Sequence, residues 1–292
     1  MAEFEGLNHI VRTDEPLAPF SSLQIGGPAK YFAEPTTIEE LRSIVASCSR
    51  QEIGIRLLGD GTNVLISDAG YDGMVIHLNS AEFTSIEVLE SGLKCSGGCK
   101  LTHFISTAVR EGFSGPERLI GIPGTVGGAL HGNASANNGD IGQWTLSAEV
   151  MTRSGEIKTR SAHEMNFGYR QSSLSELVIL NATFAFEKED PVELTKRMQK
   201  LWISKKASSP GTTSRSAYLF KDPGGVTAAS LIEDAAQKQL LKGGLRLDQK
   251  NANFLIADPG ATSENAVEFI NEIKDNVAAK LGVNLEIGIE IW

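Results

Sequence analysis

The amino-acid sequence predicts an α+β fold in which short strands outnumber helices. Short apolar runs bounded by turn residues recur along the chain, and only a few longer stretches show the apolar spacing of helices. The two kinds of segment do not alternate regularly, as they would in a doubly wound parallel sheet. With 292 residues the chain is long enough for two domains, or for one large domain with an appendage, and for a substantial core.

The first third of the chain predicts a β-α-β unit. Residues 20–32 form an extended segment broken by a glycine pair, and Thr37-Ile-Glu-Glu40 has the spacing of a capping box at the start of a helix. The apolar stripe of that helix consists of Ile38, Leu41, Ile44 and Val45. A strand over 55–58, a polar turn and an apolar run over 64–67 complete the unit.

The remaining elements follow from the same periodicities. Strands are predicted over 74–78, 85–89, 92–96, 146–152, 156–160 and 178–186. Predicted helices are marked by Leu101, Phe104, Ile105 and Ala108, by a basic stretch over 192–206, by 227–237, and by Val267, Ile270, Ile273 and Val277. Residues 251–256 lead into a strand, and residues 285–292 alternate as a last one. Asp190-Pro191 is a natural boundary between domains.

The composition favours small-molecule ligands over polymers. A net charge of −9 and a pI of about 5.2 leave no broad basic surface for nucleic acid or an anionic membrane. No run approaches the ~20 apolar residues that span a bilayer, and the first residues lack the basic start and apolar run of a signal peptide. We therefore expect a cytoplasmic protein without nucleic-acid or membrane partners.

The cysteines and histidines give no sign of a disulfide framework or a metal site. Three cysteines are an odd number, which suits a reducing compartment, and Cys95-Ser-Gly-Gly-Cys99 has the wrong spacing for a two-residue redox motif. We expect the cysteines to be unreactive packing residues. The five histidines are scattered, and none stands beside a second ligand at zinc spacing, so no bound metal is expected.

Two glycine loops have the character of a diphosphate cradle. Gly59 and Gly61 allow positive φ and leave main-chain N–H groups open to a ligand oxygen, while Thr62 and Asn63 add side-chain donors. The alternative is an ordinary turn between strands, since Asp-Gly and Asn occur in turns of any fold. A second loop over 121–128 has the same character, so the two favour a phosphate-bearing ligand together.

Three further polar segments have both a structural and a functional interpretation. The run 133–140 consists of small and polar residues that a core does not need. Arg170 lies in a glycine-containing turn over 167–173, where an arginine is usually a solvated surface charge. The basic helix over 192–206 is either a solvated helix face or an attraction for an anionic substrate.

Taken together, the motifs resemble those of a known enzyme family. They are Ile25-Gly-Gly-Pro-Ala, Gly59-Asp-Gly-Thr-Asn63, Gly121-Ile-Pro-Gly-Thr-Val-Gly-Gly128, Gly168-Tyr-Arg-Gln-Ser-Ser173 and the C-terminal layout. In this combination the sequence resembles the MurB family of UDP-N-acetylenolpyruvoylglucosamine reductases, flavoenzymes of peptidoglycan synthesis. The resemblance covers nearly the whole chain and is greater to the family's shorter branch. Each motif is weak alone, and the ordered set is specific.

The resemblance implies a fold, a cofactor and a reaction. The fold is α+β, with a two-subdomain FAD-binding region of the vanillyl-alcohol-oxidase/MurB type over 1–190 and a smaller substrate domain over 191–292. NADPH reduces bound FAD, which passes hydride to the enolpyruvyl ether of UDP-N-acetylglucosamine enolpyruvate and gives UDP-N-acetylmuramate. That reaction belongs to cell-wall biogenesis, and so to cell shape and division. A UDP sugar is the expected partner, and a monomer the expected state.

The resemblance also implies site residues. The cofactor-binding positions are Gly59, Asp60, Gly61, Thr62, Asn63, Ile122, Pro123, Gly124, Thr125, Gly127, Gly128 and Asn133. The substrate-binding positions are Tyr169, Lys221 and Asp222, and the catalytic arginine matches Arg170. In the family the arginine and a glutamate stabilise the charge that develops on the enolate, and a serine or cysteine donates the proton.

The substrate-facing motifs depart from the family pattern. Tyr218 stands at the serine or cysteine position, Gly288 at the glutamate position, and Asp222 where an asparagine contacts substrate. In a strand, Glu286 and Glu290 would share the face of residue 288, about 6–7 Å away. The other departures are Asn251 for a histidine, Ala236 and Gln239 for glycines, and Ser135 for a glycine near the flavin.

Three hypotheses remain open from the sequence. The first is a working enolpyruvyl reductase in which Tyr218 is the rearranged acid, since a phenol with a pKa near ~10 can donate a proton. The second is an FAD-binding relative without this activity, serving as a regulator or scaffold or acting on another substrate. The third is an oxidase of the wider flavin superfamily, which shares the FAD fold.

Overall fold

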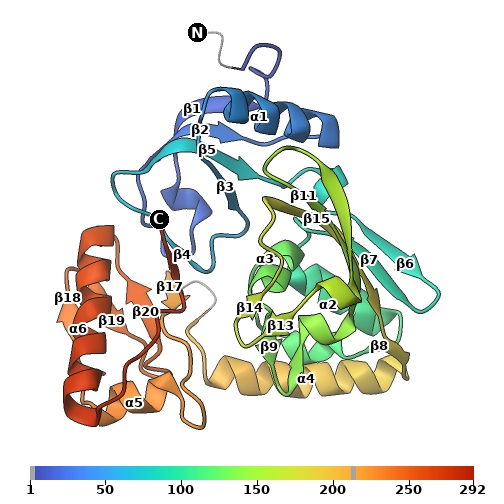
Figure 1. Cartoon of the computed structure of the whole chain (residues 1–292). Helices are drawn as coiled ribbons and strands as arrows, with labels where there is room; N and C mark the ends of the chain where they lie inside the picture. Colours follow the sequence, from blue (N-terminus) through green and yellow to red (C-terminus); the bar gives the residue numbers. More distant parts are fainter. Residues whose placement is uncertain (1–3, 212–214) are drawn as a thin grey trace. The chain divides into compact units, whose positions relative to one another are not determined.

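The computed structural model describes residues 4–211 and 215–292 and divides into two compact units (Figure 1). Unit 1 comprises the chain up to Asp14, Lys30–Asp60 and Asp72–Ser204; unit 2 comprises Glu15–Ala29, Gly61–Tyr71 and Lys205–Trp292. These compact units do not follow the predicted boundary at residue 190, because 191–204 cluster with unit 1 and two N-terminal segments with unit 2. The functional division at 190 stays a prediction.

The first sheet of unit 1 has the strand order β1-β2-β5-β3. The strands are β1 (Val11–Pro16), β2 (Pro28–Ala33), β3 (Ile55–Leu58) and β5 (Tyr71–His77), with β3 and β5 parallel. Helix α1 (Ile38–Arg50) begins at the capping box, which is confirmed: Thr37 accepts a hydrogen bond from the Glu40 N–H and Glu40 bonds back. Its apolar stripe packs against Met74 and Ile76 of β5 in one buried cluster.

The second sheet of unit 1 is antiparallel throughout, with the order β12-β11-β15-β7-β6. Its strands are β6 (Ile86–Leu89), β7 (Gly92–Ser96), β11 (Thr145–Met151), β12 (Ile157–Ser161) and β15 (Val178–Ala185), close to the predicted ranges. Helices α2 (Leu101–Arg110) and α3 (Val126–His131) lie beside it (Figure 1). Phe104, Val126 and Phe184 share the resulting core.

Shorter elements complete unit 1. They are η2 (Ala81–Phe83), β8 (Phe113–Ser114), η3 (Pro116–Leu119), β9 (Ser135–Ala136), β10 (Gly139–Asp140), η4 (Ile141–Trp144), η5 (Ala162–Glu164), β13 (Phe167–Gly168), β14 (Gln171–Ser172) and β16 (Glu187–Lys188). The predicted basic helix is α4 (Pro191–Ala207). It is not a purely solvated face, because Arg197 bonds to the fully buried Glu117 at 3.0 Å and also to Glu189.

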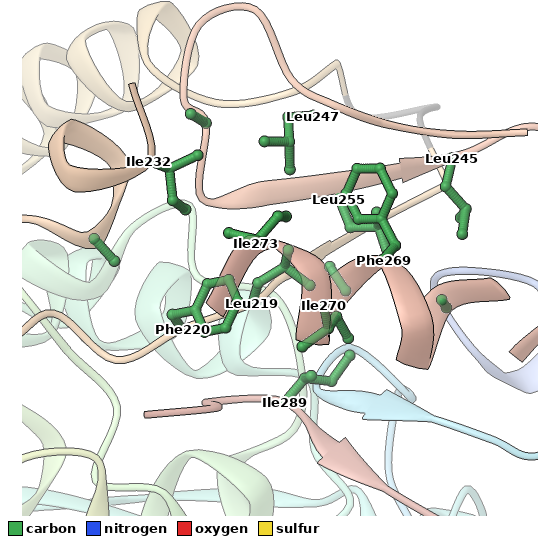
Figure 2. Close-up of a cluster of buried hydrophobic side chains, with 14 of the residues drawn as sticks. Leu219, Phe220, Ile232, Leu245, Leu247, Leu255, Phe269, Ile270, Ile273 and Ile289 are labelled. Atoms are coloured by element: carbon green, nitrogen blue, oxygen red, sulfur yellow. The ribbon is translucent and has the colours of Figure 1, made fainter. Parts of the chain in front are cut away.

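Unit 2 is built on the antiparallel sheet β17-β20-β19-β18 and two helices. The elements are β17 (Ser216–Tyr218), α5 (Ala228–Asp234), β18 (Leu241–Lys242), β19 (Leu245–Leu247), β20 (Phe254–Ala257) and α6 (Ser263–Leu281). The predicted stripe of α6 is confirmed, because Ile270 and Ile273 are buried with Phe269 (Figure 2) and Val277 belongs to the same buried cluster. Gly282, at φ 70°, ends α6 in the left-handed conformation that favours glycine.

Two N-terminal segments belong to the same core. Strand β4 (Val64–Leu65) pairs in parallel with β21 (Glu290–Ile291), and the short helix η1 (Ala18–Phe20) lies in the other segment. The prediction that residues 64–67 complete a β-α-β unit with 55–58 is therefore wrong, because 64–65 pair with a different strand. The last predicted strand is wrong in length, since only 290–291 of 285–292 pair as a strand. Leu23, Ile25 and Leu65 are buried in the cluster of Phe269.

Candidate functional site

A cavity of about 300 Å³ lies in unit 1. Its walls come from the ends of β3 and β5, the loop between β7 and α2, and the loop before α3. The lining residues are Gly59, Asp60, His77, Leu78, Asn79, Thr84, Gly98, Cys99, Lys100, His103 and Thr125. The cavity therefore brings together Gly59 and Asp60 of the first glycine loop with Thr125 of the second.

The loops around the cavity approach one another too closely for side chains. A Cβ on Gly59 would lie 3.0 Å from the Thr125 hydroxyl oxygen, and one on Gly127 would lie 3.0 Å from the Gly97 carbonyl oxygen. The Gly127 N–H donates to that same carbonyl at 2.7 Å. Gly124, at φ 118°, has a backbone conformation open mainly to glycine. These glycines allow the loops to pack closely beside the cavity, and the prediction that they cradle a ligand stays a prediction.

Charged side chains at the cavity form ion pairs and hydrogen bonds with neighbouring residues. The Lys100 ammonium group lies 2.6 Å from the Asp60 carboxylate. Glu34 bonds to His77 at 3.0 Å and accepts from the Asn79 amide at 2.6 Å. Burial opposes the ionisation of Glu34, but the hydrogen bonds from His77 and Arg12 prevail and lower its pKa.

Sequence reasoning missed His77, Asn79, Lys100 and His103 because they lie outside the glycine motifs. A signal was present for Lys100, which follows Gly97-Gly98 and stands directly before a helix. His77 and Asn79 come at the end of a buried strand, where polar side chains often meet a ligand. Their convergence on one cavity becomes visible only once β5 is placed beside β3.

The second half of the first glycine loop belongs to unit 2, since the division falls between Asp60 and Gly61. Gly61 has φ 59°, and a Cβ there would lie 2.1 Å from the Phe20 carbonyl oxygen, so glycine is required. The Asn63 side chain donates to the Gly288 carbonyl at 3.2 Å, and the Asn63 carbonyl accepts from the Glu290 N–H at 3.0 Å. Asn63 thus links the predicted cradle to the C-terminal segment.

Arg170 occupies the turn of the hairpin β13–β14 in unit 1. Its backbone has φ 57°, and the neighbouring Tyr169 is 50% exposed. Asn133 is only 5% exposed: its amide nitrogen donates to the Gly168 carbonyl at 2.9 Å, and its amide oxygen accepts from the Gly142 N–H at 3.2 Å. The predicted cofactor residue Asn133 therefore uses its side chain to hold the hairpin that carries Arg170.

Tyr218 and Asp222 come together in unit 2. The Tyr218 hydroxyl donates to both carboxylate oxygens of Asp222 at 3.2 Å, and the Ala228 N–H at the start of α5 donates to one of them at 2.8 Å. The Tyr218 ring packs edge-on against Phe254, with 5.3 Å between centroids. Asp222 is thus a partner of the phenol at the predicted proton-donor position.

A side chain at residue 288 would pack tightly against the backbone of the neighbouring segment. A Cβ there would lie 3.3 Å from the Lys221 nitrogen and the Phe220 carbonyl carbon, so the neighbours must shift by a few tenths of an ångström. Glu286 pairs with the Lys221 ammonium group at 2.5 Å, and Glu290 accepts from the Trp292 indole at 3.1 Å. Residues 285–289 are not a strand, so the premise that both glutamates share one strand face with residue 288 is wrong.

Residues 4–211 and 215–292 contain no helix that is long and apolar enough to cross a membrane. In the same part of the chain, no group of three or more histidine, cysteine, aspartate or glutamate side chains is suited to hold a metal ion.

Family models match two parts of the chain. Residues 29–161 match the FAD binding domain, and residues 209–292 match the C-terminal domain of UDP-N-acetylenolpyruvoylglucosamine reductase. The first match covers the cavity-lining residues of unit 1, and the second covers Tyr218 and Gly288. The FAD prediction from the sequence is thereby confirmed at the level of the domain.

Relatives extend the likeness over the whole chain. The UDP-N-acetylenolpyruvoylglucosamine reductase of Rhodopirellula baltica is 38% identical over 288 residues, covering 99% of this chain and 94% of that protein. The Listeria innocua reductase is 34% identical over 283 residues, covering 96% and 94%. Among solved structures, MurB from Thermus caldophilus has a TM-score of 0.81 at 28% identity, covering 97% of this chain and 98% of that one.

A more distant structure shows the fold alone. Physcomitrella patens BBE-like 1 is 12% identical, with a TM-score of 0.56, over 88% of this chain and 82% of that one. The assignment itself rests on the 38% identity over 99% of the chain and on the match to the reductase C-terminal domain. The chain belongs to the UDP-N-acetylenolpyruvoylglucosamine reductase (MurB) family.

Proposed function

We propose that the protein is an FAD-dependent, NADPH-using reductase that converts UDP-N-acetylglucosamine enolpyruvate to UDP-N-acetylmuramate. The observation that carries the proposal is the 38% identity to a named reductase over 99% of this chain and 94% of that protein. The role belongs to peptidoglycan precursor synthesis, and through it to cell shape and division. We further propose that the protein acts as a cytoplasmic monomer.

The residues of unit 1 fit FAD. A cavity of about 300 Å³ suits one part of a dinucleotide, since ligand sites span roughly 300–1,000 Å³. Gly59 and Thr125 lie at its wall, and Lys100, which pairs with Asp60, is a cation that a diphosphate could contact there. When bound, FAD carries hydride from NADPH to the enol ether. We propose that these residues, with the rest of the two glycine loops, hold the cofactor.

Arg170 is proposed to stabilise the charge that develops on the substrate. Hydride addition next to the enolpyruvyl carboxylate makes that group enolate-like, and a guanidinium group stabilises such an oxyanion through fixed hydrogen bonds. The hairpin turn and the Asn133 amide hold Arg170 in place before substrate arrives. Tyr169 and Lys221 are proposed substrate contacts.

Tyr218 is proposed to deliver the proton. Its hydroxyl hydrogen is oriented by Asp222, which is itself fixed by the Ala228 N–H. Proton release places a phenolate beside a carboxylate, and that repulsion makes Tyr218 a slow acid. The same carboxylate repels a UDP diphosphate by about 1–4 kcal/mol, depending on its exposure. We therefore expect turnover below that of an enzyme with serine and asparagine at these positions.

The test is NADPH oxidation by the purified yellow protein with and without the enolpyruvyl sugar. We expect sugar-dependent oxidation that falls about 10²-fold or more in Arg170→Lys and in Tyr218→Phe, with the flavin spectrum unchanged. Absence of sugar-dependent oxidation with FAD bound and both substrates saturating would contradict the proposal. It would favour the FAD-binding relative without this activity, which the missing side chain at Gly288 also suits.

A further inference from the structure

A carboxylate in unit 1 is completely buried and has no part in the proposed chemistry. It belongs to Glu117 of η3, whose side chain is 0% exposed. One of its oxygens accepts a hydrogen bond from the Gly115 N–H at 2.6 Å, and the other accepts from the Arg197 guanidinium group of α4 at 3.0 Å. A buried charge is costly unless it is paired and hydrogen-bonded. Arg197 therefore supplies the partner that this carboxylate requires.

Arg197 is itself fixed from two sides. Its guanidinium group also bonds to Glu189, and the second carboxylate oxygen of Glu189 accepts from the Ser114 hydroxyl at 2.5 Å. Ser114 and Glu117 lie close to Gly115 in the chain, so Arg197 reaches the segment before η3 through Glu189 and η3 itself directly. A planar guanidinium group makes two such contacts in fixed directions, which a lysine ammonium group does not reproduce.

Helix η3 is tied to both of the polar, glycine-containing segments that follow it. The Ile122 N–H, at the start of the second glycine loop, donates to the Leu119 carbonyl at 3.1 Å. In the turn between β9 and β10, the Asn137 amide donates to the Arg118 carbonyl at 2.7 Å, and the Asn138 carbonyl accepts from the Arg118 guanidinium group at 3.1 Å. A displacement of η3 therefore displaces both segments.

We propose that Arg197 is a positioning residue for FAD, which acts through Glu117 and η3 to keep the second glycine loop in its binding conformation. This role rests on the proposed function, in which that loop holds the cofactor. Neither Arg197 nor Glu117 lines the cavity of unit 1, whereas Thr125 of the loop does. The effect of Arg197 on the cofactor is therefore indirect.

Loss of Arg197 would leave a buried carboxylate without its cationic partner. The Glu117 side chain then gains by turning toward water, which pulls η3 and the loop out of place. If the fraction of molecules with the loop in its binding conformation falls to about one tenth, the apparent Kd for FAD rises about tenfold. A purely structural ion pair predicts a different result, namely an equal loss of stability with and without FAD and an unchanged Kd.

The experiment is a titration of the full-length apoprotein with FAD, followed by flavin fluorescence, with the visible circular dichroism of the bound flavin as a second readout. We expect Arg197→Met to raise the Kd about tenfold or more. Arg197→Lys keeps the charge and should raise the Kd less. The control is Lys196→Met, which removes a neighbouring charge of α4 that pairs with Glu193 of the same helix at 2.8 Å, and it should leave the Kd within about twofold.

A second variant tests whether Arg197 acts through Glu117. Glu117→Gln keeps an acceptor for the Gly115 N–H and removes the charge that needs a partner. In that background, Arg197→Met should raise the Kd by less than about threefold, because no buried charge is left unpaired. If Arg197→Met alone does not fold, as judged by circular dichroism, Arg197→Lys is compared in the native and Glu117→Gln backgrounds instead.

A folded Arg197→Met variant that binds FAD as tightly as the native chain overturns the proposal. An equal weakening in the native and Glu117→Gln backgrounds also overturns it, since Arg197 would then act by another route. Both results leave the proposed reductase activity untouched, because they concern only the affinity for FAD. Native protein that binds FAD but shows no sugar-dependent NADPH oxidation contradicts the reductase alone.

Discussion

Residue 288 is a direct place to test the rearranged site, because its backbone conformation does not require glycine and a Cβ there needs the neighbouring backbone to shift by only a few tenths of an ångström. Gly288 is not among the positive-φ glycines, and a Cβ there would lie no closer than 3.3 Å to its neighbours. We expect Gly288→Glu to raise sugar-dependent kcat at least about tenfold by restoring a charged group near the acid. Gly288→Gln, of equal size and no charge, is the control. Equal rates for the two variants would contradict a role for the carboxylate.

Asp222 gives a second gain-of-function prediction. Asparagine can still accept from the Ala228 N–H and from the Tyr218 hydroxyl, while the charge that opposes both the diphosphate and the phenolate disappears. We expect Asp222→Asn to lower KM for the UDP sugar roughly tenfold, since about 1.4 kcal/mol corresponds to one power of ten. Initial-rate kinetics with varied UDP sugar measure this KM. An unchanged KM would show that the carboxylate does not face the diphosphate.

A substitution at Asn133 tests whether this residue positions the Arg170 turn or contacts the cofactor. Asn133→Asp keeps the acceptor for the Gly142 N–H but places a carboxylate oxygen against the Gly168 carbonyl, where the amide donated. We expect kcat to fall about tenfold or more while FAD remains bound, because the Arg170 turn loses its anchor. The flavin spectrum and kcat are measured together. Loss of FAD with kcat per bound flavin unchanged would instead indicate a cofactor contact.

Individual residues also show which features of the site the sequence could predict and which it could not. The close approaches at Gly59 and Gly61 were predictable from the glycines themselves: a Cβ on Gly61 would lie 2.1 Å from the Phe20 carbonyl oxygen, and one on Gly59 would lie 3.0 Å from the Thr125 hydroxyl oxygen. The partner of Asn133 was not, because nothing in a local pattern says which distant carbonyl an amide will meet. The same holds for Tyr218, whose pairing with Asp222 depends on the turn that follows β17.

Among the secondary-structure elements, helix α1 makes the clearest pH prediction. The backbone N–H of Thr36, the His9 side chain and the Thr36 hydroxyl bond to Glu40 and lower its pKa to about 2 from 4.5. A lowered pKa means that the native state holds the proton less tightly, so the stabilisation is present above pH 4.5 and is lost as the pH falls toward 2.

We therefore expect Glu40→Gln to lower the free energy of unfolding by about 1 kcal/mol at neutral pH. The difference from the native chain should shrink below pH 4.5, where the native carboxylate begins to lose its advantage. Urea denaturation across that range measures it, with Glu39→Gln in the same helical turn as the control. A difference that stays constant with pH would contradict the electrostatic origin.

Elements differ in how much of them the sequence could predict. The capping box of α1 and the apolar stripe of α6 are local patterns, and both are found in the structure. The pairing of β4 with β21 joins residues more than two hundred positions apart, and no local pattern encodes it. The run 64–67 looked like a neighbour of 55–58 because proximity in the chain is the only guide that a single sequence offers.

At the scale of the whole molecule, the chain cannot be cut into its two compact units by a single break. Unit 2 takes Leu23, Ile25 and Leu65 from two N-terminal segments into the core that contains Phe269. Losing one buried leucine side chain costs about 2–5 kcal/mol, and domains are stable by only about 5–15 kcal/mol.

We expect an isolated fragment of residues 205–292 to lack cooperative unfolding, although it contains the whole match to the reductase C-terminal domain. Thermal melting followed by circular dichroism, with the full chain as the control, measures this. A sharp melting transition in the fragment alone would show that β4 and the leucines of the N-terminal segments are dispensable.

The parallel pairing of β4 with β21 sets an order of events on the ribosome. Residues 64–65 leave the exit tunnel early, yet their strand partner at 290–291 is translated more than two hundred residues later. At roughly 5–20 residues per second, the interval is roughly 10–50 s. During that time the apolar residues 64–65 lack their strand partner, so the nascent chain is exposed to chaperones and proteases until residues 290–291 have been made.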